Sequence, residues 1–120
     1  MNPFADASTM IAAIRGHQIS SAAVVELYAT RRERLHGRVN AIVTPDVGRA
    51  LEAARRIDAG EGPARGALTG LPITVKDGIH VAGLPSTGGS EKRRLAGGKG
   101  ESQNVQRLLA AVALNIRKTK

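Results

Sequence analysis

"LTGLPITVKDGIHVAGLPSTGGS", residues 68–90, runs from a short apolar stretch into a succession of turns, and a lysine stands where the two meet. Apolar and polar side chains alternate before that lysine, which predicts a strand over residues 72–76 that ends at Lys76. The apolar residues that follow predict a second short strand over residues 79–82, before a long glycine-rich loop. This stretch raises the question of why an ammonium group ends a strand.

Apolar residues recur at helical spacing on both sides of this stretch. Ser20 is a suitable N-cap for one helix, and Gly37 is expected to end it. Thr44 can cap the next helix with Pro45 at the first position, where the missing N–H costs nothing. Ser102 is expected to cap the last helix. The expected helices cover residues 7–15, 20–36, 45–59 and 102–112.

Two further short strands are expected, at residues 41–44 and 113–117. Strands that alternate with helices favour an α/β fold with a mixed or parallel sheet. Such a sheet needs a neighbour for every interior strand, and the few short strands found here do not complete one. With one Phe, one Tyr and no Trp, large side chains for a core are also scarce. We therefore expect residues 1–120 to form the N-terminal portion of a larger α/β domain.

The chain is basic, with 18 Lys and Arg residues against 10 Asp and Glu residues. This charge leaves a small RNA-binding module open as an alternative function. However, the charges are dispersed along the sequence, and no aromatic residues lie between them to stack on bases. We therefore interpret the basic residues as a solvated surface and do not expect nucleic acid as a partner.

No cofactor or metal is expected. The chain has no cysteine, which excludes disulfides and thiolate catalysis, and His17, His36 and His80 lack the spacing of metal ligands. The N-terminal residues do not have the pattern of a signal peptide, and no apolar run is long enough to span a bilayer. The expectation is a cytoplasmic protein without membrane contact.

Lys76 has two interpretations from the residues alone. In the first, it forms an ion pair or lays its stem along an apolar surface while the ammonium group stays in water. In the second, the packed sheet partly removes the ammonium group from water, which disfavours the charged form. A neutral amine could then take a proton from a serine hydroxyl. Asp77 would oppose this by favouring the charged form.

Three stretches, which together cover nearly the whole chain, share one likeness: "HQISSAAVVELYATRRERLHGRVNAIVT", "GALTGLPITVKDGIHVAGLPSTGGS" and "NVQRLLAAVALNIRKTK". The second stretch is similar to a "GxPxxVKD" strand followed by "VAGxPTTxGS", and the third to a "VVxRLxxAGAxxxGKTN" helix and strand. In this order they resemble the amidase signature family. The first stretch is similar to that family's second helix and following strand, and the second to the segment around its catalytic lysine.

The resemblance implies the fold and the chemistry. The family's fold is an α/β/α sandwich around a large mixed sheet, and its reaction is hydrolysis or transfer at a carboxamide through a Ser-cisSer-Lys triad. By position, Lys76 is the triad lysine, which deprotonates the bridging serine and so activates the nucleophilic serine. Those two serines belong to a Gly/Ser-rich signature that residues 1–120 do not contain. We therefore expect an amidase of which this chain carries only the lysine-bearing part and is inactive alone.

The resemblance also limits the other candidates. Gly88, Gly89 and Ser90 match structural positions of the family, so we do not expect Ser90 to be the nucleophile. The implied partner is a small-molecule amide, and a homodimer is an arrangement that the resemblance allows for the whole enzyme. The corresponding part of a glutamine-dependent tRNA amidotransferase, in its amidase-like component, remains an alternative to a free-standing amidase.

The chain departs from the family's pattern near its end. Val112 stands where the family has a glycine, Arg117 replaces the glycine before "KT", and Lys120 replaces an asparagine. A β-branched residue adopts the left-handed conformation only at a cost, so Val112 is a poor helix cap. These departures weaken the prediction of the last strand.

Overall fold

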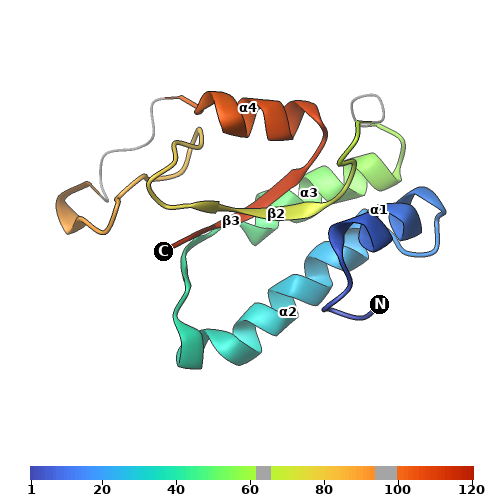
Figure 1. Cartoon of the computed structure of the whole chain (residues 1–120), viewed down its shortest axis with the longest axis horizontal. Helices are drawn as coiled ribbons and strands as arrows, with labels where there is room; N and C mark the ends of the chain where they lie inside the picture. The colour runs from blue at the N-terminus through green and yellow to red at the C-terminus, as the bar shows by residue number, and fades with distance from the viewer. Residues whose placement is uncertain (62–65, 94–99) are drawn as a thin grey trace.

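The computed structural model describes residues 1–61, 66–93 and 100–120 (Figure 1). These residues form four α-helices, one 3-10 turn and a sheet of three strands. In chain order the elements are α1 (Ala7–Arg15), α2 (Ser21–Val39), β1 (Ile42–Pro45), α3 (Val47–Asp58), β2 (Pro72–Lys76), η1 (Glu91–Arg93), α4 (Gln103–Ala110) and β3 (Leu114–Thr119). The expected α/β class is confirmed.

The sheet is mixed, and its central strand is the last one in the chain. The strand order is β1-β3-β2, with β3 antiparallel to β1 and parallel to β2. In the parallel pair Val75 lies opposite Lys118, and Lys76 lies opposite Thr119. The pairing continues one residue past β2, because Asp77 N donates to Thr119 O at 2.7 Å. The carboxyl ends of β2 and β3 therefore meet at the same edge of the sheet.

Helices cover both faces of the strands. Figure 1 shows α4 on one side of the sheet, and α1 and α2 on the other. On the α4 side, Val75 of β2 packs with Val105 of α4. On the other side, Leu114 of β3 joins a cluster with Val25 of α2 and Ala54 of α3. This is the layered arrangement expected of an α/β/α sandwich.

The helix starts follow the expected caps in two cases. Ser20 accepts a hydrogen bond from Ala23 N, and Ser102 accepts one from Val105 N. The third expected start is wrong, because Pro45 ends β1 and α3 begins only at Val47.

Two helix ends differ from the expectation. Helix α2 continues through Gly37 to Val39 and is closed by Asn40, whose left-handed backbone lets its N–H donate to His36 O. Helix α4 ends at Ala110, two residues before the expected end. Asparagine tolerates the left-handed conformation well, so Asn40 can end α2 in place of Gly37, the residue expected to do so.

The expected strand at residues 79–82 is wrong. Ile79 N donates to Lys76 O, and Leu84 N donates to Val81 O, so this segment consists of two tight turns. Its apolar residues are explained by burial, because Val81 is 1% exposed and packs with Val75. Apolar character in a short run indicates burial, and it does not distinguish a paired strand from a turn.

The last strand forms despite the departures from the family pattern. Val112 adopts the left-handed conformation with φ of 64°, and β3 begins two residues later. The side chain of Val112 is buried, and Gly70 N donates to its carbonyl at 3.0 Å. Burial and pairing of the strand offset the backbone strain that a β-branched residue carries there.

Candidate active site

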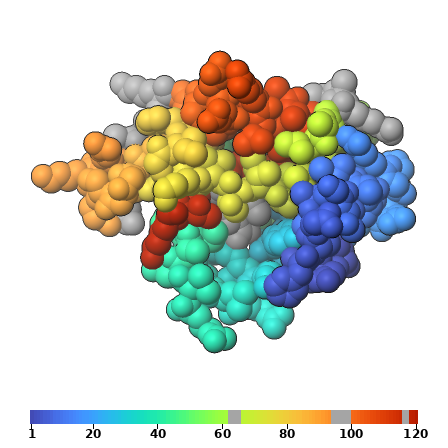
Figure 2. All heavy atoms as spheres, viewed as in Figure 1, coloured from blue at the N-terminus to red at the C-terminus, as the bar shows by residue number. Residues whose placement is uncertain are grey.

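Lys76 ends β2 at the rim of an open depression with a volume of about 460 Å³. The depression is lined by β1, by the turn after β2, by the loop that contains Gly88 and Gly89, and by Lys120. Figure 2 shows the C-terminal residues (red) between the segment after β2 (yellow) and the region of β1 (teal). The backbone of Lys76 is held by pairing with β3, and its carbonyl closes the turn to Ile79.

The side chain of Lys76 is exposed to solvent. This exposure agrees with the first interpretation of Lys76, in which the ammonium group stays in water, and not with desolvation of the amine by the packed sheet. The reason is geometric: Val75 points into the α4 side of the sheet, and the next residue points the other way, toward the depression. The lysine is held by its backbone while its amine is accessible.

The buried lysine of this region is Lys118 of β3, whose side chain is fully shielded from solvent. Its ammonium group donates to Asp77 O at 2.9 Å, to Pro85 O at 2.7 Å and to Ser86 Oγ at 2.7 Å. It also lies 3.6 Å from the Asp77 carboxylate. An ammonium group has three protons, and here each has an acceptor.

Asp77 connects this lysine to the glycine-rich loop. Its carboxylate accepts hydrogen bonds from both the backbone N–H and the hydroxyl of Thr87. The same hydroxyl accepts from Gly89 N at 3.2 Å, and Ser90 N donates to Thr87 O at 3.0 Å. A continuous set of hydrogen bonds thus runs from the central strand to the wall of the depression.

The pKa values of both charged groups in this network lie below their usual values, for different reasons. Burial lowers the pKa of Lys118, and the nearby Asp77 carboxylate opposes this only in part. Burial alone would raise the pKa of the Asp77 carboxyl. The hydrogen bonds from Thr87 and the positive charge of Lys118 outweigh that effect, so the pKa of Asp77 is also lowered.

Residues of the glycine-rich loop have structural roles. Ser86 Oγ lies between Lys118 Nζ and Ile79 O, to which it donates at 3.3 Å. Gly88 and Gly89 both have positive φ, of 54° and 85°, which glycine adopts without strain. Ser90 lines the depression beside them.

Sequence reasoning misses Lys118. In the sequence it is only part of the "KT" pair that resembles the family pattern, and nothing in "NIRKTK" distinguishes it from Lys120. The burial of Lys118 becomes apparent only from the strand register, which places it opposite Val75, on the face of the sheet that α4 covers.

The described residues offer no metal centre and no membrane span. No group of three or more His, Cys, Asp or Glu side chains among them could hold a metal ion. No helix in the described part of the chain is long and apolar enough to cross a membrane.

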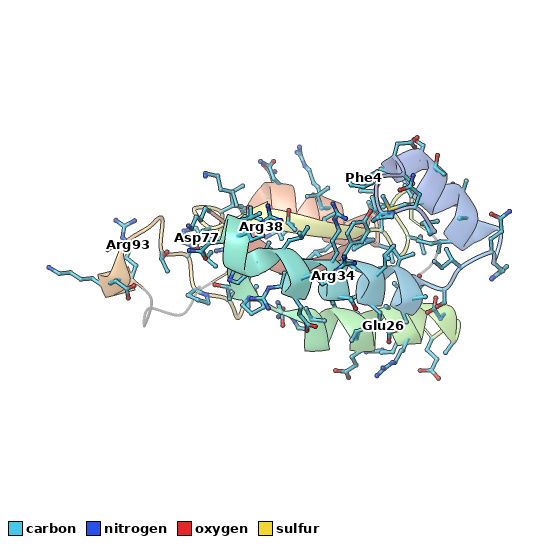
Figure 3. All side chains as sticks on the ribbon, turned by 90° about the horizontal axis from the view of Figure 1, so that it is seen from below. Phe4, Glu26, Arg34, Arg38, Asp77 and Arg93 are labelled. Carbon is cyan, nitrogen blue, oxygen red and sulfur yellow. The ribbon has the colours of Figure 1, made fainter. Side chains whose placement is uncertain are left out.

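Arg34 and Arg93 lie on separate segments of the structure (Figure 3). Figure 3 shows Arg93 on a projecting segment, far from Arg34 on α2. Arg31 stacks over the ring of Phe4, with 4.4 Å between its guanidinium carbon and the ring centroid. Arg94 lies outside the described residues.

Comparisons with known proteins agree on one family. The family model "Amidase" matches residues 23–120. The chain is 38% identical, over 104 residues, to a glutamyl-tRNA(Gln) amidotransferase component of Salinispora arenicola, in a match that covers 83% of this chain and 21% of that protein. It is also 38% identical, over 120 residues, to AmiB2 of Mycobacterium tuberculosis, which is named as an amidase, with coverage of 97% and 25%.

Solved structures give the same result. The peptide amidase of Stenotrophomonas maltophilia superposes with a TM-score of 0.86 at 25% identity, over 98% of this chain and 25% of that one. The chain thus spans a quarter or less of the length of the proteins that it matches here.

Proposed function

Because this chain belongs to the amidase signature family, we propose that it is the lysine-bearing part of an enzyme that hydrolyses a carboxamide C–N bond. Enzymes of this family act on small amide substrates. Lys76 is the lysine of the Ser-cisSer-Lys triad in this proposal, and the other two members come from sequence that residues 1–120 do not contain.

One observation carries the assignment of Lys76. Its backbone is fixed by the parallel pairing of β2 with β3, while its side chain is exposed over a depression. A proton acceptor needs both a fixed position and access to the group that it deprotonates. Lys118, the buried lysine of β3, has all its protons engaged and does not line the depression.

The chemistry follows from the access of the amine. In its neutral form, Lys76 takes the proton of the bridging serine, which in turn deprotonates the nucleophilic serine as that serine attacks the amide carbonyl. Backbone N–H groups of a glycine-rich loop hold the oxyanion.

The chain alone is inactive in this proposal. It holds the base without the nucleophile and without the oxyanion hole, and catalysis requires all three in fixed positions. The whole enzyme is proposed to be cytoplasmic, to work without a cofactor, and to form a homodimer if it associates.

The likeness to an amidotransferase component supports a second candidate. In that case the whole protein would release ammonia from glutamine and pass it to an acyl-tRNA. A free-standing amidase hydrolyses simple amides without a second protein. The two candidates are separated by whether the purified whole protein turns over simple amides by itself.

The test is to assay the whole protein against simple aliphatic and aromatic amides, and to treat it with a serine-directed fluorophosphonate. We expect amide turnover that is lost as one serine outside residues 1–120 becomes labelled. Turnover that survives complete labelling, or labelling of Ser86 or Ser90 with loss of turnover, contradicts the proposal. The 120-residue chain, treated in parallel, should show neither turnover nor labelling.

A further inference from the structure

We propose that Lys118 is a positioning residue for this site: its buried ammonium group holds the two segments that frame Lys76. The first segment is the turn that begins at Asp77, directly after Lys76. The second leads through Pro85 and Ser86 to the glycine-rich wall of the depression. The catalytic meaning of this role rests on the proposed function of Lys76, whereas the positioning itself can be tested without it.

The chemistry of the contacts requires a charged lysine. The carbonyl oxygens of Asp77 and Pro85 can only accept hydrogen bonds, so both protons come from the amine. The third proton goes to Ser86 Oγ, whose own proton goes to Ile79 O. An ammonium group satisfies all three acceptors at once, and the Asp77 carboxylate balances its charge at 3.6 Å.

Few hydrogen bonds separate Lys118 from the two walls of the depression, which are the turn after β2 and the glycine-rich loop. From Lys118 the network passes through the Asp77 carboxylate to Thr87, and from Thr87 to the N–H groups of Gly89 and Ser90. The Lys118 side chain joins the turn after β2 directly to Pro85, because one ammonium group donates to both backbones. Removal of the ammonium group would leave carbonyls on both segments without this partner.

The two lysines therefore have separable roles. Lys118 is buried with every proton engaged, whereas Lys76 is exposed at the rim of the depression. Replacement of Lys118 should loosen the loop, and replacement of Lys76 should leave the loop unchanged. Methionine has a length and an apolar stem similar to those of lysine, so Lys118→Met and Lys76→Met form a matched pair.

The test is amide hydrogen exchange in the 120-residue chain at neutral pH. We expect Lys118→Met to accelerate exchange at the N–H groups of Ile79, Gly89 and Ser90 by about 10-fold or more, while those of α2 change less. Lys76→Met should match the wild type at all of them. Unchanged exchange at Ile79, Gly89 and Ser90 in Lys118→Met would overturn the proposal.

A milder variant covers the case in which Lys118→Met unfolds. Ser86→Ala removes one of the three acceptors and leaves both carbonyl contacts in place. We expect it to accelerate exchange at Ile79 and Gly89 by a few-fold, with α2 unchanged. If Ser86→Ala accelerates exchange equally in α2 and in the loop, the network is a general stabilising element and the positioning role is wrong.

Activity of the whole protein gives the second readout. Loss of positioning should lower kcat in Lys118→Met and in Ser86→Ala with little change in KM, because the base is displaced while the substrate pocket remains. If Lys76→Met keeps full turnover, the proposed function fails, although the exchange result for Lys118 stands. If kcat is unchanged in a folded Lys118→Met protein, the catalytic part of this proposal fails and the assignment of Lys76 stands.

Discussion

The ammonium group of Lys118 lies 3.6 Å from Oδ1 of Asp77, and their side chains are 0% and 6% exposed. This pair joins the central strand of the sheet to the turn after Lys76. A buried charge that loses its partner is costly, so each member of the pair depends on the ionisation of the other.

The first prediction concerns the stability of the chain at acid pH. The pKa of Asp77 is lower in the folded chain than in the unfolded chain, so its contribution to stability is present above the unfolded pKa, about 3.9, and is lost as the pH falls through the folded pKa. At pH 7 we expect Asp77→Asn to lower the free energy of unfolding by about 2 kcal/mol or more. The measurement is urea denaturation from pH 7 to pH 3.

The difference between wild type and Asp77→Asn should shrink as the pH falls below about 4. The control is Glu52→Gln, which replaces an exposed acid on α3 and should change stability little at any pH. A difference that stays constant to pH 3 would show that the Asp77 charge contributes nothing.

The second prediction concerns the strained backbone at Val112, where φ is 64°. Alanine keeps the Cβ atom that makes this conformation costly, and glycine removes it. We expect Val112→Gly to be more stable than Val112→Ala by about 1 kcal/mol in urea denaturation. This order of stability is the reverse of the usual one, in which alanine is more stabilising than glycine.

The matched control is Val105, which is also buried but lies within helix α4. There we expect the ordinary order, with Val105→Ala more stable than Val105→Gly by about 1 kcal/mol. The same order at both sites would mean that the left-handed conformation of Val112 carries no strain.

The third prediction concerns Asn115 of β3. Its side-chain N and O atoms are both buried, and neither has a hydrogen-bond partner among the residues that the structure describes. Leucine has nearly the same shape without the polar atoms, so Asn115→Leu should raise the free energy of unfolding of this chain by about 1 kcal/mol. The control is Asn104→Leu, at an exposed position of α4, which should change it by less than about 0.5 kcal/mol. Destabilisation by Asn115→Leu would show that the amide is satisfied.

The parts of the fold that could be predicted are those fixed by neighbours in the sequence. The cap at Ser20 and the strand β2 depend on residues within a few positions, and the structure contains both. The sequence is misleading at residues 79–82 because their apolar pattern reports burial, and only the tertiary structure shows that Val81 packs in a turn.

The buried cation could not be predicted, for a related reason. The three acceptors of Lys118 lie 32 to 41 residues away in the sequence, and they converge only when β3 enters the sheet beside β2. The position of Lys76 was predictable because it follows directly from the end of a strand. Its exposure was one of two outcomes that the residues alone left open, because the alternation of side chains along a strand does not say which face is covered.

The assignment of Lys76 as the proton acceptor is tested most directly by the turnover of an amide by the whole protein with Lys76→Ala and with Lys76→Arg, compared with wild type. Hydrogen exchange in the loop serves as the check on folding. General-base catalysis contributes on the order of 10²–10⁴ in rate, so both variants should lose at least about 100-fold in kcat with folding nearly intact. Arginine keeps the charge but stays protonated, so it cannot replace the base. Wild-type turnover in either folded variant would contradict the assignment.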